Sequence, residues 1–277
     1  MKRYMAKRVL SFGECEAFVR RFCSENPFSD PMLSDDKQIT DRLIKAIAKR
    51  EDHIVIGVFK DREMAGLFLF LVLKDEQYLE MLAGLSCDRE AYNAMFAYLK
   101  EHFAGYSADV VFNPNNELLS NWLRQKGAAF DTEQQKMVYG NSALDADTSG
   151  VALLTEPYIL SYLEMHNANL YWTGDKVIEA PDRFRTFVAV ENGTVVGYLD
   201  VTHCFEENEP FDLLVREGYR RKGYGRKLLA KALEMNRPNA MVLHVNIDNV
   251  PAIRLYESLG FVKAENQNSV VARLFLS

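Results

Sequence analysis

The fold is decided by one short stretch, Arg220-Arg221-Lys222-Gly223-Tyr224-Gly225. It stands between an apolar run, Phe211 to Val215, that predicts a strand, and the run Gly225 to Met235, whose leucines and alanines recur at helical spacing. Two glycines at a strand-to-helix turn let the backbone approach a ligand closely, and the first turn of a helix carries unpaired amide groups at its positive end. The stretch therefore predicts a site for a phosphate or pyrophosphate group.

Basic side chains crowd this helix start, where acidic side chains are ordinarily preferred. They belong to Arg220, Arg221, Lys222, Arg226 and Lys227. A bound polyanion would make this charge favourable, and the alternative interpretation is an ordinary basic surface turn. The stretch does not fit the P-loop pattern, which needs Lys and then Ser or Thr where Tyr224 and Gly225 stand. It does not fit the dinucleotide pattern either, because Leu228 stands where the third glycine belongs.

A second block lies downstream, where residues 240–245 predict a strand and residues 249–259 a helix. The pattern Asn-x-x-Ala-x-x-x-Tyr-x-x-x-Gly-Phe is filled by Asn249, Ala252, Tyr256, Gly260 and Phe261. The pattern Arg/Gln-x-x-Gly-x-Gly/Ala is filled upstream by Arg220, Gly223 and Gly225. The two blocks, in this order and on these elements, resemble the acetyl-coenzyme A (acetyl-CoA) signature of the GNAT N-acetyltransferase superfamily. The resemblance covers about residues 150–277.

Composition indicates a globular protein without a membrane-spanning helix. The 277 residues allow one large domain or two ordinary ones, and 48% of them are hydrophobic and 26% charged. No apolar run approaches the ~18 residues of a membrane span, and the N-terminus lacks the apolar core of a secretory signal. The net charge of −6 argues against a nucleic-acid partner and suits a cationic amine substrate. We therefore expect neither a nucleic-acid nor a membrane partner.

Cysteine and histidine usage predicts a reducing compartment and no metal site. The four cysteines form no Cys-x-x-Cys pair, and the five histidines lack the spacing of metal ligands. A chain of this length needs no disulfides to stabilise its core. We therefore expect a cytoplasmic protein without a metal ion.

Residues 140–150 are small, polar and acidic and show no periodicity, which is typical of a linker. Before them, helical and strand patterns alternate and end in a closing strand at residues 128–139. After them the pattern restarts and ends in the last strand or strands. The sequence therefore predicts one domain at residues 1–140, a linker at residues 141–150 and a second domain at residues 151–277.

The two halves correspond at an offset of 133 residues, which indicates a duplication. Asn246, Asn249 and Gly260 correspond to Asn113, Asn116 and Gly127. The same offset places Cys87, Glu90, Tyr92 and Leu123 where the second half has Arg220, Gly223, Gly225 and Tyr256. A carboxylate and a bulky ring at a phosphate loop repel the ligand and block the approach of the backbone. The first half thus resembles a GNAT domain that lacks a cofactor site, in a tandem arrangement of the mycothiol synthase type.

The resemblance implies an α/β fold of two tandem GNAT-like domains, each with a mixed, mostly antiparallel central sheet flanked by helices. It implies that the strand before the loop splays from its neighbour, so that the main chain of Leu213 and Val215 pairs with the pantetheine arm of acetyl-CoA. Plain core strand is the alternative for these two residues. The implied pyrophosphate and pantetheine contacts further involve Arg220, Arg221, Lys222, Gly223, Tyr224, Gly225, Arg226 and Asn249.

Two kinds of side chain would carry the chemistry. A departing thiolate needs a proton donor, and the resemblance gives this role to Tyr256, for which packing in the core is the alternative. The amine needs a proton acceptor, for which Glu209 and Asp212 stand on or near the strand before the loop. An unbroken strand puts residues three positions apart on opposite faces, so only one would face the cleft unless a bulge intervenes. We favour Glu209, with two solvated acids as the alternative.

The predicted function is transfer of an acetyl group from acetyl-CoA to a primary amine, on a small molecule or a peptide, by direct attack in a ternary complex. Tyr162, Tyr171 and Trp172 either shape the acceptor site or belong to the core. One alternative is an enzyme of the mycothiol synthase type that acetylates a small amino compound. Another is an acyl-CoA-binding sensor or scaffold without turnover, which would need neither Tyr256 nor Asn249.

Overall fold

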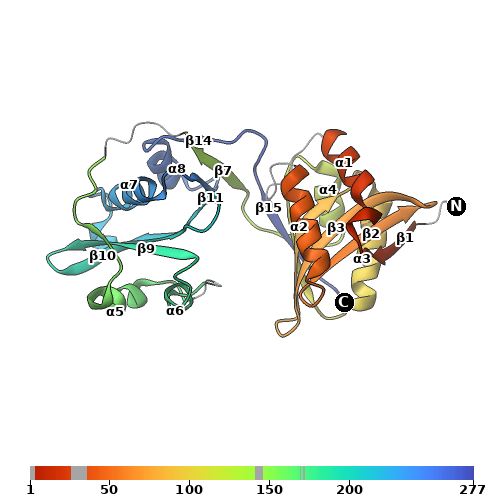
Figure 1. Cartoon of the computed structure of the whole chain (residues 1–277), viewed down its shortest axis with the longest axis horizontal. Coiled ribbons are helices and arrows are strands. Elements are labelled where there is room, and N and C mark those ends of the chain that lie inside the picture. The colour runs from red at the N-terminus through yellow and green to blue at the C-terminus, as the bar shows by residue number, and fades with distance from the viewer. Residues whose placement is uncertain (1–3, 26–35, 141–145, 169, 171) are drawn as a thin grey trace. The chain divides into compact units, whose positions relative to one another are not determined.

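A computed structural model describes residues 4–25, 36–140, 146–168, 170 and 172–277 (Figure 1). The chain forms two compact units, of which the first comprises residues 1–135 and 265–277 and the second residues 136–264. Both units have helices packed on sheets in which antiparallel pairs predominate. This confirms the predicted fold class. No helix in the described part of the chain is both long enough and apolar enough to cross a bilayer.

The first unit contains one seven-stranded sheet. In spatial order its strands are β1 (Tyr4–Arg8), β2 (His53–Lys60), β3 (Glu63–Leu73), β4 (Tyr78–Leu85), β5 (Ser107–Phe112), β15 (Val270–Phe275) and β6 (Ala129–Phe130). Strands β4 and β5 are parallel, and the other neighbours are antiparallel. Along β3, Leu67 and Leu69 pack on one face and Phe68 and Phe70 on the other, because side chains alternate along a strand. All four are buried, so both faces of this sheet are covered.

Two pairs of helices cover this sheet. They are α1 (Glu16–Glu25) with α2 (Asp36–Ala48), preceded by the short turn η1 (Phe12–Glu14), and α3 (Arg89–His102) with α4 (Glu117–Gln125). The first pair packs on the face that carries Leu67 and Leu69. The second pair packs on the opposite face, where Tyr92 and Trp122 are buried.

The second unit contains two four-stranded sheets. One has the order β12 (Pro210–Val215), β10 (Thr194–Thr202), β9 (Phe184–Glu191) and β8 (Val151–Leu153), and all its pairs are antiparallel. The other has the order β11 (Glu207–Asn208), β13 (Ala240–Asn246), β7 (Gln134–Tyr139) and β14 (Phe261–Lys263). Strands β12 and β13 therefore belong to different sheets.

The helices of the second unit lie on both sides of the β9–β10 pair. They are α5 (Glu156–Met165), α6 (Gly174–Ile178), the short turn η2 (Glu217–Tyr219), α7 (Tyr224–Asn236) and α8 (Val250–Glu257). Figure 1 shows α7 on one side of β9 and β10 and α5 and α6 on the opposite side. Leu228, Leu229 and Leu233 of α7 are buried, as their helical spacing predicted.

The compact units differ from the predicted sequential domains at residues 1–140 and 151–277. The closing strand of the first half includes β7, which pairs with β14 in the second unit. The last strand, β15, lies between β5 and β6 of the first unit. An alternating pattern fixes which face of a strand is buried but does not fix which strand lies beside it. Of the predicted linker at residues 141–150, residues 141–145 lie outside the described part of the chain.

The predicted duplication is visible in equivalent helix ends. Asn116 caps α4 by accepting from the amide of Leu119, and Asn249 caps α8 by accepting from the amide of Ala252. Gly127 and Gly260, which follow these two helices, have φ values of +77° and +96°. Because this left-handed conformation favours glycine, the same two residue types recur for the same structural reason.

Candidate active site

An opening between β12 and β13 is the central feature of the second unit. Strand β11 pairs in parallel with β13, from Glu207 opposite Ala240 to Asn208 opposite Met241. The chain then leaves β13, and β12 pairs with β10 instead. The two strands therefore separate directly after Asn208 and Met241, which confirms that the strand before the loop splays from its neighbour.

The main chain of β12 is directed partly into this opening. The amide of Arg216 donates to the carbonyl of Val196 on β10 over 2.9 Å. Because hydrogen bonding alternates along an antiparallel pair, Leu214 also turns its amide and carbonyl toward β10. Leu213 and Val215 then turn theirs toward the opening, and Arg220 Nε donates to the carbonyl of Val215 over 3.1 Å. The backbone of Leu213 and Val215 is thus oriented to pair with an extended ligand.

The loop before α7 leaves a helix start without a side-chain cap. Gly223 occupies the N-cap position with φ +89°, and the first turn contains no acidic residue. Arg221 also has a positive φ, of +65°. A Cβ atom on Gly225 would lie 3.4 Å from Leu255 Cδ2. The first-turn amides, at Tyr224, Gly225 and Arg226, are therefore available to an anionic ligand.

The five basic residues near this helix start fall into two groups. Arg220, Arg221 and Lys222 are exposed around the loop. Arg226 instead donates to the carbonyl of Ser258 over 2.8 Å, and Lys227 forms an ion pair of 2.6 Å with Asp147. The side chains of the first group can meet a polyanion, whereas those of the second group tie α7 to neighbouring segments.

Tyr256 and Asn249, both from the second sequence block, lie on α8. The side-chain oxygen of Asn249 accepts from Ala252 N over 3.3 Å, which leaves its NH₂ group for a ligand. The hydroxyl of Tyr256 has no hydrogen-bond partner within the described ranges. Burial, followed by the negative charges of Asp212 and Glu209, raises the pKa of Tyr256. Its phenol is therefore protonated at neutral pH and can donate a proton.

Glu209 and Asp212 do not sit on one unbroken strand. The register between β10 and β12 shifts after the pair Asp200–Asp212, where Val201 faces Pro210, so a bulge intervenes. Glu209 Oε1 lies 3.0 Å from His244 Nδ1. Asp212 Oδ2 accepts from the hydroxyl of Tyr198 over 2.6 Å. Both carboxylates raise the pKa of Tyr256, so both lie near its phenol.

A buried polar cluster next to Asp212 was missed by sequence reasoning. Asp200 is fully buried and accepts from Thr186 Oγ1 over 2.6 Å and from the Tyr162 hydroxyl over 3.0 Å. His166 Nε2 lies 3.1 Å from the same carboxylate and 3.9 Å from Asp212. Burial alone would lower the pKa of His166, but the hydrogen bond and charge of Asp200, with the charge of Asp212, raise it.

The cluster could not be seen in the sequence because its members are far apart along the chain. The pairing of β10 with β12 brings Asp200 directly opposite Asp212. One ligand atom from each of His166, Asp200 and Asp212 lies within 4.8 Å of the others, a spacing that would admit a metal ion. Hydroxyl groups already donate to both carboxylates, so hydrogen bonds account for the arrangement without an ion.

Three aromatic residues were predicted either to shape the acceptor site or to belong to the core: Tyr162, Tyr171 and Trp172. Tyr162 is fully buried and bonded to Asp200, so it belongs to the core. The Trp172 ring lies 4.9 Å from that of Phe184, which in turn lies 5.7 Å from that of Phe211. Tyr171 lies outside the described residues. Phe211 of this aromatic row directly precedes Asp212 in β12.

In the first unit, the loop before α3 corresponds to the loop before α7, and side chains of the unit itself occupy the place of the ligand. The Asp88 carboxylate caps α3 by accepting from Glu90 N over 2.9 Å, which occupies the helix start that a phosphate would need. The ring of Tyr92 is fully buried, and its hydroxyl donates to the carbonyl of Ser86 over 2.5 Å. Asn116, the counterpart of Asn249, donates to that same hydroxyl over 3.3 Å.

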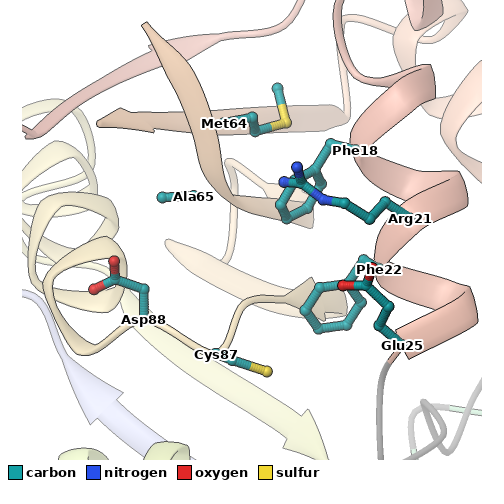
Figure 2. A pocket seen from close by; sticks show the side chains of 8 residues that line it. All are labelled: Phe18, Arg21, Phe22, Glu25, Met64, Ala65, Cys87 and Asp88. Atoms are coloured by element: carbon teal, nitrogen blue, oxygen red, sulfur yellow. The ribbon is translucent and has the colours of Figure 1, made fainter. Parts of the chain in front are cut away.

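A hollow of about 360 Å³ borders this loop in the first unit. Figure 2 shows that its lining comes from α1, β3 and the loop between β4 and α3; the residues are Phe18, Arg21, Phe22, Glu25, Met64, Ala65, Cys87 and Asp88. Cys87 and Asp88 correspond to Arg220 and Arg221 at the offset of 133 residues. The lining contains one arginine and two carboxylates, so the hollow lacks the excess of positive charge that the loop of the second unit has.

A comparison with protein families identifies the family to which this part of the chain belongs. The Acetyltransferase (GNAT) family matches residues 151–261, within the second unit. The second unit is a GNAT acetyltransferase domain. Acetyl-CoA is the acetyl donor of GNAT enzymes, and the opening, the uncapped helix start and the main chain of β12 fit it.

Curated relatives match the same part of the chain. The [ribosomal protein bS18]-alanine N-acetyltransferase of Escherichia coli (strain K12) is 34% identical over 86 residues, which are 30% of this chain and 58% of that enzyme. The N-alpha-acetyltransferase RimI of Mycobacterium tuberculosis is 35% identical over 77 residues, which are 26% of this chain and 49% of that enzyme. The chain thus spans less than two thirds of the length of these N-acetyltransferases.

Solved structures show that the GNAT likeness extends over the whole chain. A GCN5-related N-acetyltransferase from Sphaerobacter thermophilus has a TM-score of 0.68 at 14% identity and covers 99% of this chain and 96% of its own. A tandem GNAT protein from the clavulanic acid biosynthesis pathway has a TM-score of 0.61 at 12% identity and covers 100% of this chain and 99% of its own. Both units therefore have a GNAT-like fold.

Proposed function

We propose that this chain transfers the acetyl group of acetyl-CoA to a primary amine by direct attack, and that only the second unit performs the reaction. The observation that carries the proposal is the opening between β12 and β13. It combines an uncapped helix start with the hydroxyl of Tyr256 and the carboxylates of Glu209 and Asp212. A donor site, a proton donor and a proton acceptor are then available in one unit.

The residues predicted from the sequence would hold acetyl-CoA as follows. The main chain of Leu213 and Val215 pairs with the pantetheine arm, and the NH₂ group of Asn249 bonds to it. The amides of Gly223, Tyr224 and Gly225 meet the pyrophosphate at the positive end of α7. The neighbouring side chains and amides that support this contact are those of Arg220, Arg221, Lys222 and Arg226.

The chemistry divides between two sides of the opening. The amine loses its proton on the side that holds Glu209, which leaves the nitrogen lone pair free to attack the thioester carbonyl. Tyr256 then supplies the proton that the departing thiolate takes. The raised pKa of Tyr256 keeps its phenol protonated at neutral pH, so a proton is available when the thiolate departs.

The acceptor is a small-molecule or peptide amine. The name of the Escherichia coli relative specifies an alanine of a ribosomal protein, which makes the α-amino group of a peptide one acceptor to test. The acidic side of the opening suits a cationic amine, since Asp212 and Glu209 both lie there. A short peptide with N-terminal alanine, lysine, glucosamine and a polyamine form a suitable panel.

A screen for thiol release tests the proposal. The full chain is mixed with acetyl-CoA and each amine, and free CoA is followed together with the mass of the acetylated product. We expect amine-dependent release of CoA. Binding of acetyl-CoA without release for any amine would instead indicate an acyl-CoA sensor, and absence of binding would remove both functions.

A further inference from the structure

His244 has incomplete hydrogen bonding inside the second unit. Its Nδ1 lies 3.0 Å from Glu209 Oε1, whereas its Nε2 exposes less than 1 Å² and has no partner among the described residues. The other two histidines of this unit have their Nε2 atoms occupied, in His166 by Asp200 and in His203 by the carbonyl of Pro181. Buried polar atoms are nearly always paired, so an unpaired one needs an explanation.

His244 lies on β13, near the point where this strand separates from its neighbour. Strands β11 and β13 stop pairing after Asn208 and Met241, and Glu209 is the next residue of the chain. The contact between Glu209 and His244 therefore joins the two diverging strands just beyond the point where they separate. The backbone of Glu209 is held at the end of β10, because its amide donates to Thr202 Oγ1 over 2.8 Å.

The carboxylate of Glu209 determines where the imidazole carries its hydrogen. An ionised carboxylate can only accept, so Nδ1 of His244 must be the donor. In the neutral ring Nε2 then has a lone pair and is the nitrogen able to take a proton. The contact with Glu209 also fixes the plane of the ring.

On the basis of the proposed acetyl transfer, we propose that Nε2 of His244 is the atom that accepts the proton of the acceptor's ammonium group, and that Glu209 is a positioning residue acting through His244. Tyr256, on α8, lies close enough to Glu209 for the charge of that carboxylate to act on its phenol. The proton acceptor on β13 and the proton donor on α8 then serve the same carbonyl.

The step balances in atoms and charge. One N–H bond of the ammonium group breaks, its electron pair stays on nitrogen, and the proton joins Nε2 of His244. The nitrogen forms a bond to the thioester carbon, the C–S bond breaks with its pair on sulfur, and Tyr256 protonates the thiolate. The second nitrogen proton restores Tyr256, and the imidazolium releases its proton to water. Ammonium and thioester thus give amide, thiol and one proton.

The test compares His244→Asn with Glu209→Gln, using the amine of the panel that wild type acetylates fastest. Asn keeps a donor near the position of Nδ1 but has no basic nitrogen. We expect kcat to fall about 10² to 10⁴-fold in His244→Asn, with acetyl-CoA affinity by calorimetry unchanged. Glu209→Gln should lose less. The double variant should be no slower than His244→Asn, because Glu209 acts through the ring.

Rescue by imidazole separates a base from a structural residue. In His244→Ala, kcat should rise with added imidazole, whereas in Tyr256→Phe, which lacks an acid, it should not. His203→Asn is the matched control, since it removes a histidine of the same unit that contacts the carbonyl of Pro181. Full turnover in His244→Asn, or a greater loss in Glu209→Gln, would overturn the assignment and return the base role to Glu209. If wild type binds acetyl-CoA but acetylates no amine, the proposed function fails first, and the base role fails with it.

Discussion

At the scale of single residues, a substitution of Tyr256 can distinguish a role in proton transfer from a role in binding acetyl-CoA. Replacing it by phenylalanine keeps the ring, whose centroid lies 5.9 Å from that of Phe261, and removes only the proton donor. We expect kcat to fall by about 10² to 10⁴-fold, because that is the usual contribution of general acid catalysis. Steady-state kinetics with the best amine of the panel measures this loss.

Two control measurements on Tyr256→Phe distinguish a catalytic role from a role in packing or in donor recognition. The melting temperature and the acetyl-CoA affinity of Tyr256→Phe should match wild type, since packing is preserved and the hydroxyl has no partner within the described ranges. Unchanged turnover would make Tyr256 a packing residue. Lost acetyl-CoA binding would instead place its hydroxyl in recognition of the donor.

His166 allows a test of pH dependence at the same scale. Its pKa is raised above the ordinary value of 6.5, so the folded state holds its proton more tightly than the unfolded chain. This stabilisation is fully present below about pH 6.5 and is lost as the pH rises through the folded pKa. The free energy of unfolding of the second unit should therefore decrease with pH over this window.

The measurement uses the two tryptophans, because Trp122 lies in the first unit and Trp172 in the second. In Trp122→Phe, urea unfolding followed by Trp172 emission reports the second unit alone. Adding His166→Gln keeps a donor for Asp200 and removes the titration, so the slope above about pH 6.5 should flatten. An unchanged slope would show that another group causes the dependence.

At the scale of elements, the start of α7 should hold the pyrophosphate. Replacing Gly225 by glutamate adds a carboxylate at an uncapped helix start, where the ligand's negative charge must come. We expect acetyl-CoA affinity to fall at least tenfold while the fold is kept, since a Cβ at this position has ordinary contact with Leu255 at 3.4 Å. Gly218→Glu is the matched control, because a Cβ there meets nothing within 4 Å. Equal losses in both variants would indicate a general charge effect.

Local elements were largely predictable from the sequence, whereas pairings between distant segments were not. Spacing identified α7, α8 and the loop between β12 and α7, because helix periodicity and turn glycines act over a few residues. His244 and Asp200 were missed, since nothing near them in the sequence marks a site. Their roles depend on sheet geometry: β10 brings Asp200 opposite Asp212, and the separation of β12 from β13 brings His244 to Glu209.

At the scale of the whole molecule, the chain should bind one acetyl-CoA. In the first unit Asp88 already caps α3, and the ring of Tyr92 fills the place of the second glycine. Calorimetry on the full chain should therefore give one site, and Gly225→Glu should leave none. A site of similar affinity remaining in Gly225→Glu would show that the first unit binds the donor as well.

The exchange of strands between the halves also predicts an unusual effect of truncation. Strand β15 lies between β5 and β6 and buries Val270, Ala272 and Leu274 in the core of the first unit, although it follows the second unit in the chain. A chain that ends at Ala264 loses this strand but keeps every strand of the second unit. We therefore expect the C-terminal truncation to unfold the N-terminal unit. The second unit should keep its fold and its affinity for acetyl-CoA.

Tryptophan emission and calorimetry check this prediction together. In a truncated chain carrying Trp172→Phe, the emission of Trp122 should shift toward that of exposed tryptophan, because its side chain is now only 1% exposed. In the truncated chain with both tryptophans, acetyl-CoA should still bind one site. If Trp122 stays buried and donor binding is lost instead, the last strand stabilises the second unit, as the sequential domains at residues 1–140 and 151–277 would require. Burial contributes about 1.5 to 3 kcal/mol for each of the two larger side chains, Val270 and Leu274. The loss of these contributions is enough to unfold a domain of ordinary stability.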